Sequence, residues 1–309
     1  MLLGFLWSFW YTQNLDFRRL FAPLDPMPPM FADSGAYTAH TKGQPVNVMD
    51  YGSWVYEWRK YFPHYANLDV KGDVDAGLRN LEVLQGLGLA PIPVYHGGEP
   101  WSVWEDFCRD FDYVALGGMA GGVMQTHNPK VLHWLDKCFE IANGKAVHGF
   151  GMTNWSVVRR YPWRSVDSSS IGSGYRYGQV NIYNPYEKSW KKWAVADKIA
   201  WGRYGWLVRE YGLEPADFSR PRTRGCTRAL IRLATRSMRK AIDDLPQHES
   251  FKTQMYVVDD GGTQAGLRRV EAFNQANQTQ VYVADTAMQE RDVGDGLTRA
   301  DVVNEVNAA

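Results

Sequence analysis

Two aspartates in this chain could perform chemistry together. Asp33 lies in the segment 31–37, which reads FADSGAY and ends an apolar run, and Asp167 directly follows Val166. Two carboxylates in one pocket suit retaining displacement at a sugar's anomeric carbon, because one can attack while the other carries the leaving group's proton. An isolated aspartate at a strand end can instead cap the next helix. The displacement hypothesis therefore depends on the fold bringing both carboxylates together.

Further polar or glycine residues end other short apolar runs. They are Asp69 after 65–68, His96 after 92–95, Gly117 and Gly118 after 113–116, and His148 after 146–147. Asp69 and His96 would supply hydrogen-bonding groups, and paired glycines let the backbone approach a flat ligand. Tyr37 is a candidate stacking wall. A lone histidine is more often a satisfied structural residue, so these positions carry weight only as a set.

Stretches long enough for helices separate these short runs. They cover residues 49–61, 74–87, 101–109 and 129–141. This alternation predicts an α/β fold with a parallel sheet covered by helices, and chemistry in such folds gathers at the carboxyl ends of the strands. The apolar segment 255–258 is expected to be a last strand, followed by a turn at 259–262.

The whole chain favours one domain over residues 1–309. No apolar stretch reaches the roughly 20 residues of a membrane span, and segment 2–11 is expected to be a buried first strand, so no membrane partner is predicted. The three cysteines, at 108, 138 and 226, stand far apart. Neither a disulfide framework nor a cysteine-rich metal site is expected, and a reduced, cytoplasmic setting follows.

Charge is segregated although the formal net charge is zero. Residues 155–240 contain 18 lysines and arginines against 6 aspartates and glutamates, a net charge of +12 between two acidic flanks. Such a block is typical of a surface that binds a polyanion. After a loop at 168–178, helices are expected at 190–211 and 226–243, within a basic helical elaboration spanning 185–250.

One side of the second expected helix is basic. Arg228, Arg232, Arg236 and Lys240 recur every four residues, which we call the basic stripe. The stripe is either an ordinary solvated helix face or a row of phosphate contacts. A second possible path for nucleic acid runs along Arg159, Arg160 and Arg164, which precede Asp167 in the sequence.

Taken in order, these segments resemble the queuine/archaeosine tRNA-guanine transglycosylase superfamily, and more closely its phage-type DNA-guanine transglycosylases. Segment 33–37 is similar to the DSGG(Y/F) motif, in which the Asp is a general acid/base and the aromatic residue stacks on the base. Segment 166–168 resembles the FDC segment, whose Asp is the nucleophile. Segment 148–151 is similar to the MGVG segment and places His148 at a second stacking position.

The base-reading segments of that family also have counterparts. Segment 68–69 resembles the strand end whose Asp reads the guanine-like edge, 95–97 is similar to VQG with His96 in place of the glutamine, and 116–119 matches the IGGL-type loop. The resemblance covers roughly residues 1–180. It implies a modified TIM (β/α)8 barrel with helical elaborations after strand 7, and base-binding roles for Ser34, Tyr37, Asp69, His96, Gly117, Gly118 and His148.

The implied activity is exchange of guanine in DNA for a 7-deazaguanine derivative such as preQ0, with no cofactor. Asp167 would attack C1′ of a flipped-out nucleotide, and Asp33 would protonate the departing guanine. The CxCxxC zinc cluster of the tRNA enzymes is missing, so no metal is expected and DNA is favoured over tRNA. A tRNA enzyme, a catalytically inactive nucleic-acid-binding barrel and a plain glycoside hydrolase remain the alternatives. If phage-encoded, the enzyme would act in the bacterial host cytoplasm.

Overall fold

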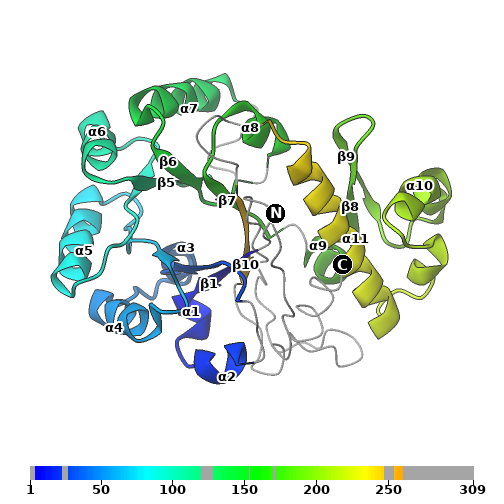
Figure 1. Ribbon diagram of the computed structural model, residues 1–309, viewed down its shortest axis with the longest axis horizontal. Coiled ribbons are helices and arrows are strands. Elements are labelled where there is room, and N and C mark those ends of the chain that lie inside the picture. The colour runs from blue at the N-terminus through cyan, green and yellow to red at the C-terminus, as the bar shows by residue number, and fades with distance from the viewer. Residues whose placement is uncertain are drawn as a thin grey trace.

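A parallel β-sheet organises the chain (Figure 1). The computed structural model describes residues 4–22, 27–119, 128–152, 154–169, 172–246 and 254–259. Eight strands follow the order β3-β2-β1-β10-β7-β6-β5-β4, and every neighbouring pair is parallel. The strands are β1 Gly4–Ser8, β2 Met30–Asp33, β3 His64–Tyr65, β4 Val94–His96, β5 Tyr113–Gly117, β6 Ala146–Gly149, β7 Ser165–Asp167 and β10 Gln254–Asp259. The predicted parallel α/β arrangement is confirmed.

Residues that flank the two outermost strands of this order, β3 and β4, contact each other. Ala66, just after β3, forms a parallel bridge with Ile92, just before β4. The Ile92 N–H donates to the Tyr65 carbonyl at 2.8 Å, and the Asn67 N–H donates to the Ile92 carbonyl at 2.8 Å. Backbone hydrogen bonds therefore join the first strand of the order to the segment that leads into the last.

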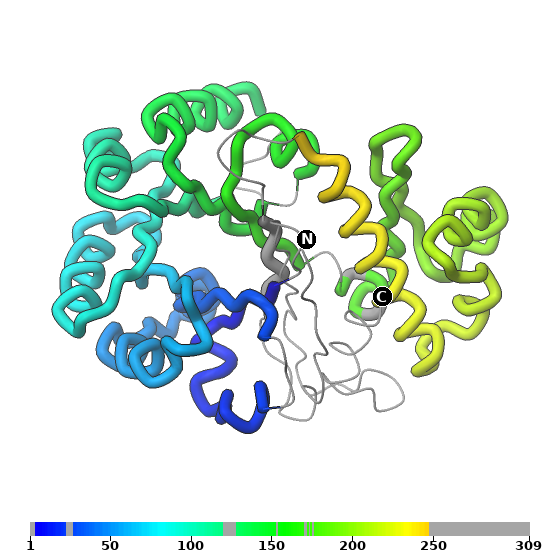
Figure 2. Tube along the Cα trace, in the orientation of Figure 1, coloured from blue at the N-terminus to red at the C-terminus, as the bar shows by residue number. Residues whose placement is uncertain are grey.

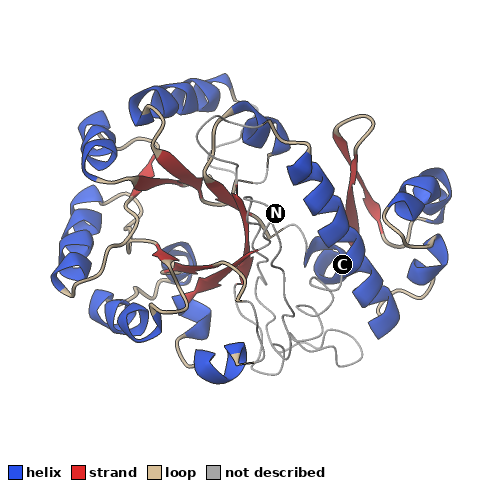
Figure 3. Cartoon of the chain, viewed as in Figure 1, coloured by secondary structure: helices blue, strands red, loops and turns tan. Residues whose placement is uncertain are grey.

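Helices cover the outside of the sheet (Figure 3). They are α1 Phe9–Thr12, α2 Phe17–Phe21, α3 Ala36–Lys42, α4 Val48–Trp58, α5 Val74–Gly86, α6 Trp101–Asp110, α7 Pro129–Ala142 and α8 Trp155–Arg160. Polar N-caps fix several helix starts: the side chains of Asn47, Asp73, Asn128 and Asn154 accept backbone N–H groups of the first turn. The four helices expected between residues 49 and 141 are confirmed. No helix in the described ranges is both long and apolar enough to cross a membrane.

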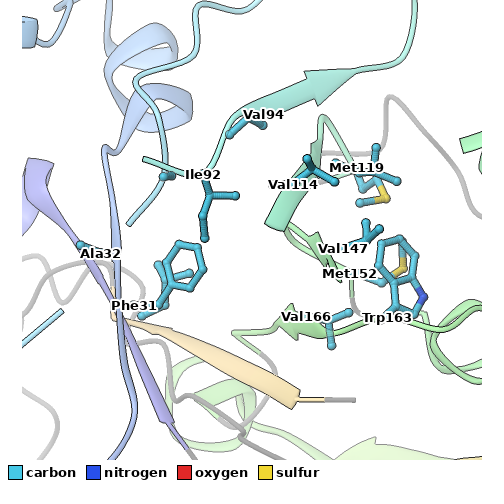
Figure 4. Close-up of a cluster of buried hydrophobic side chains, with 14 of the residues drawn as sticks. Phe31, Ala32, Ile92, Val94, Val114, Met119, Val147, Met152, Trp163 and Val166 are labelled. Atoms are coloured by element: carbon cyan, nitrogen blue, oxygen red, sulfur yellow. The ribbon is translucent and has the colours of Figure 1, made fainter. Parts of the chain in front are cut away.

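Alternation along the strands sorts side chains onto two faces. The register pairs His96 with Gly117, His148 with Ser165, and Ser8 with Asp33, and paired residues of parallel strands point the same way. Their neighbours in the sequence point to the helices: Val114, Val147 and Val166 cluster with Trp163 and Met152 in Figure 4. One face of the sheet therefore collects the polar residues, while the other is apolar.

A long excursion separates β7 from β10 and lies to one side of the eight strands (Figure 2). It contains α9 Ser173–Tyr177, the antiparallel hairpin β8 Gln179–Asn184 and β9 Ser189–Ala194, α10 Lys198–Glu210, the 3₁₀ helix η3 Pro215–Phe218, and α11 Arg224–Asp243. The excursion has its own hydrophobic cluster, which includes Ile182, Trp193, Leu207 and Leu233. The described part of segment 185–250, expected as a basic helical elaboration, lies within this excursion and includes part of the hairpin.

The helix expected over 190–211 is wrong in its first part. Residues 189–194 form β9, and the helix begins only at Lys198. The Asn184 side chain accepts the N–H groups of Tyr186 and Glu187, which builds a turn, and Lys188 adopts a positive φ of 49°. This turn chemistry directs the chain back as a strand. The helix expected at 226–243 and the strand expected at 255–258 are confirmed as α11 and β10; residues 260–262 lie outside the described residues.

Candidate active site

The two candidate catalytic aspartates end two strands of the same sheet. Asp33 is the last residue of β2, and Asp167 is the last residue of β7. All eight strands are parallel, so both carboxylates lie at the carboxyl end of the sheet, and the register places them on the same face. The structure thus brings together the two residues that the sequence singled out.

Asp33 is held by the first turn of α3. Its Oδ2 accepts the Gly35 N–H at 3.0 Å. Gly35 has a φ of +76°, and a Cβ there would lie 2.5 Å from Cβ of Trp10. Any larger residue at position 35 would clash and be strained, which explains why a glycine follows Asp33 and Ser34 in the sequence. Ser34 is fully buried, and its hydroxyl accepts the Ala36 N–H at 3.3 Å.

The environment of Asp33 favours its protonated form. Burial, followed by the negative charges of Asp69 and Asp167, raises the pKa of Asp33 to about 7. The Gly35 N–H opposes this shift only in part. A carboxyl group that titrates near neutrality can both give and take a proton there, as a general acid/base must.

Asp167 is fixed through one carboxylate oxygen. The Gly151 N–H donates to Oδ1 at 2.6 Å, and His148 Nε2 lies 3.4 Å from the same Oδ1. Asp167 is almost completely buried. The orientation of this carboxylate is therefore fixed at the end of β7.

His148 occupies a different place from the stacking wall that the sequence predicted. Its ring is 0% exposed and stacks on Phe31 at a centroid distance of 4.8 Å, with Phe150 against it edge-on at 4.3 Å. A base cannot lie on this ring without displacing Phe31. His148 Nδ1 lies 2.5 Å from Ser165 Oγ, so the histidine belongs to the support of Asp167.

Asp69 and His96 form the polar wall beside Asp33. His96 Nε2 lies 3.2 Å from Asp69 Oδ2, and Nδ1 lies 3.3 Å from Glu99 Oε1. Burial alone would lower the pKa of His96, but the contacts with Asp69 and Glu99 outweigh it and raise the pKa to about 9. Near neutral pH, His96 is therefore an imidazolium between two carboxylates.

Backbone geometry explains how these groups fit together. A Cβ at Gly117 would lie 2.5 Å from His96 Nε2, so the glycine allows the imidazole to cross the end of β5. Gly118 has a φ of +79°, which favours glycine. Asn80 Nδ2 donates to the Leu68 carbonyl at 2.9 Å and holds the loop that carries Asp69. Tyr37, on α3, is 52% exposed.

The path along Arg159, Arg160 and Arg164 lies at the wrong end of the sheet for Asp167. Arg164 immediately precedes β7, and the other two end α8, which returns the chain to the amino ends of the strands. Arg160 pairs with Asp136 at 3.0 Å. These arginines do not lie beside the nucleophile candidate, because a strand and its preceding helix end on opposite sides of the sheet.

The basic stripe is only partly a solvent-facing surface. Arg228, Arg232 and Arg236 are half-buried on α11, which packs against β8, α9 and η3. Arg236 Nη1 donates to the Tyr211 carbonyl at 2.7 Å, and Lys240 pairs with Asp244 at 3.3 Å. At least two of the four members therefore have partners within the protein.

Sequence reasoning missed four residues of this site. Glu99 follows His96 by one turn, Gly151 supplies its N–H to Asp167, and Ser165 stands two residues before Asp167 on the same face. Ser8 ends β1 beside Asp33, and its buried hydroxyl has no hydrogen-bond partner among the described residues. The i, i+2 spacing in Ser165-Val166-Asp167 was the one available signal.

Within the described ranges, no three His, Cys, Asp or Glu side chains are grouped so that they could hold a metal ion, and all three cysteines are free and buried. We compared the chain with models of protein families, with curated proteins and with solved structures. None of the three comparisons found a match.

Proposed function

We propose that this protein is a guanine transglycosylase that exchanges guanine in DNA for a 7-deazaguanine base. The observation that carries the proposal is the pair Asp33 and Asp167 at the carboxyl ends of β2 and β7, where the negative charge of Asp167 helps to raise the pKa of Asp33. Asp167 accepts a hydrogen bond from the backbone N–H of Gly151, which fixes its orientation, and Asp33 has a pKa of about 7. This division of roles suits a nucleophile and a proton carrier.

The exchange proceeds by double displacement. Asp167 attacks C1′ of an extruded nucleotide and forms an ester bond as the C1′–N9 bond breaks, and the electron pair of that bond goes to the departing guanine. Asp33 protonates the leaving base and later takes the proton from the incoming base. The second base then attacks C1′ and releases Asp167. No redox or phosphate cofactor is needed, because one glycosidic bond replaces another.

The wall made by Asp69, His96 and Glu99 recognises the base. Its carboxylates accept hydrogen bonds from N–H groups of a guanine-like edge, and the imidazolium between them limits the repulsion of two neighbouring carboxylates. Gly117 and Gly118 leave room for the His96 imidazole at the end of β5 and so let this cation form part of the wall. The exposed ring of Tyr37 is the remaining candidate for stacking.

The fold supports this assignment in two ways. The bridge between Ala66 and Ile92 favours a closed (β/α)8 barrel, in which active sites lie at the carboxyl ends of the strands. The excursion between β7 and β10 carries much of the +12 block, and its cations would contact phosphates around an extruded nucleotide. Base extrusion costs a few kcal/mol, which such contacts offset.

Nucleoside analysis tests the proposal. Cells that make 7-deazaguanines would express either the wild-type protein or Asp167→Asn, and DNA and tRNA would be digested separately. We expect a 7-deazaguanine nucleoside in DNA only from cells that express the wild-type protein. The modification in tRNA alone would select the tRNA activity, and its absence from both nucleic acids would contradict base exchange.

A further inference from the structure

We propose that Tyr113, Ser165 and His148 form a buried hydrogen-bonded chain that positions the carboxylate of Asp167. The Tyr113 hydroxyl contacts Ser165 Oγ, and Ser165 Oγ lies 2.5 Å from His148 Nδ1. His148 Nε2 lies 3.4 Å from Asp167 Oδ1, a contact that does not have the geometry of a hydrogen bond and acts through electrostatic attraction. These contacts thus lead from β5 to β7 and then to β6, on the face of the sheet that collects the polar residues. They end at Asp167, the candidate nucleophile. The catalytic consequence of the chain rests on the proposed function, whereas its hydrogen bonding does not.

The chemistry of the partners sets the direction of each hydrogen bond. Burial lowers the pKa of His148, so the ring is neutral near pH 7 and carries one hydrogen. A carboxylate only accepts hydrogen bonds, and therefore the nitrogen that faces Asp167, Nε2, holds that hydrogen. Nδ1 must then accept from the Ser165 hydroxyl, whose oxygen in turn accepts from Tyr113. The chain fixes one tautomer of His148.

Other groups around His148 agree with this arrangement. Phe31 and Phe150 cover its ring. Among the described residues, the titratable groups that act on it include Asp167 on β7 and His64 on β3, and Tyr113 on β5 reaches it through Ser165. Burial, followed by the positive charge of Arg164, lowers the pKa of His64 to about 4. His64 is thus neutral near pH 7 and leaves the neutral state of His148 undisturbed.

The consequence for Asp167 concerns its two oxygens. The Gly151 N–H and His148 Nε2 both approach Oδ1, which assigns the attack on C1′ to Oδ2. After attack, Oδ1 is the carbonyl oxygen of the ester and keeps both donors. When the ester breaks, negative charge returns to a carboxylate that is already oriented. His148 is therefore a positioning residue, and Ser165 and Tyr113 act through it.

Nitrogen-15 NMR of histidine-labelled protein tests the tautomer directly, with the His148 signals assigned by their loss in His148→Gln. We expect wild-type His148 to carry its hydrogen on Nε2 between pH 6 and 8. Ser165→Ala should give a mixture of tautomers, and Ser165→Thr, which keeps the hydroxyl, should restore the Nε2–H form. Ser237→Ala is the matched control: Ser237 is also fully buried and accepts the Tyr183 N–H at 2.5 Å, but it lies on α11. It should leave the His148 signals unchanged.

Base-exchange kinetics provide the second readout. Ser165→Ala should lower kcat about 10-fold with an unchanged KM for DNA, the effect of weakening one donor in the transition state. Tyr113→Phe keeps the ring and should show a smaller loss. Wild-type His148 found as the Nδ1–H form or as an imidazolium would overturn the proposal, and so would Ser165→Ala with both tautomer and kcat unchanged. If the wild-type protein exchanges no base, the proposed function is wrong and the tautomer alone decides the hydrogen-bonded chain.

Discussion

His96 Nε2 lies 3.2 Å from Asp69 Oδ2, at the carboxyl end of the sheet where Asp33 also lies. Glu99 contacts the other imidazole nitrogen at 3.3 Å. Near neutral pH this arrangement makes His96 a cation between two carboxylates. The cation makes the proximity of the two carboxylates tolerable.

This relationship makes the stability of the fold depend on pH in a defined direction. The pKa of His96 is about 9 in the folded protein and about 6.5 in an unfolded chain. The ion contacts thus stabilise the fold fully below pH 6.5, and this contribution is lost as pH rises through 9. His96→Gln should lower the free energy of unfolding more at pH 6 than at pH 10.

Denaturant unfolding at the two pH values measures this difference. His133→Gln on α7 is the control, because His133 is exposed. It should change stability little at either pH. An equal loss for His96→Gln at pH 6 and pH 10 would show that His96 is not charged between Asp69 and Glu99.

Asp33 should control the alkaline side of the rate profile. Its pKa of about 7 predicts that protonation of the departing guanine weakens as pH rises above 7. Asp33→Asn removes the proton carrier and should reduce kcat/KM by about 100-fold to 10,000-fold, with no inflection left near pH 7. Labelled guanine exchange between pH 5 and 9 gives both results. Asp50→Asn, an exposed change on α4, should behave as wild type.

The raised pKa of Asp33 should also make the stability of the fold depend on pH. The folded protein holds the Asp33 proton up to about pH 7, whereas the unfolded chain loses it near its usual value of 3.8. Wild-type stability should therefore fall as pH rises from 4 to 7, relative to Asp33→Asn. Parallel stability curves for the two proteins over this range would mean that Asp33 is an ordinary helix cap.

The salt dependence of DNA binding tests whether the basic stripe contacts phosphates. If Arg228 and Arg232 contact phosphates, replacing both by alanine should weaken binding to all sequences and flatten the plot of log K against log salt by about 1 to 2 units. Arg236→Ala serves as comparison, since Arg236 bonds the Tyr211 carbonyl and should affect mainly stability. If the double variant has the same slope of log K against log salt as the wild-type protein, then cations other than Arg228 and Arg232 contact the DNA.

The sequence was sufficient to predict the elements that carry the main carboxylates. Asp33 follows an apolar run that forms β2, whereas Asp167 follows the single apolar residue Val166 and was singled out mainly by the resemblance of segment 166–168. The alternation of apolar runs with helix-length segments predicted the parallel sheet. The wrong helix start at 190 arose because tryptophans and lysines fit either a helix or a two-residue alternation. The turn signal in Asn184 and Pro185 was the deciding feature.

The contacts among side chains could not be predicted from the sequence. His148 looked like an available ring, but the register places it opposite Ser165 and under Phe31. Similarly, Arg236 looked like part of a surface stripe until α10 placed the Tyr211 carbonyl beside it. Such contacts depend on the packing of segments distant in the sequence, which local periodicity does not encode.

Asp167 as the nucleophile is the central claim, and trapping the covalent intermediate tests it most directly. Wild-type protein would be incubated with guanine-containing DNA without an incoming base, denatured, and analysed by mass spectrometry of its peptides. The account predicts a DNA-derived sugar ester on the peptide that contains Asp167, lost in Asp167→Asn although DNA binding persists, because an amide is a far poorer nucleophile of nearly the same shape. An adduct on another residue, or labelled-guanine exchange by Asp167→Asn at the wild-type rate, would contradict the account.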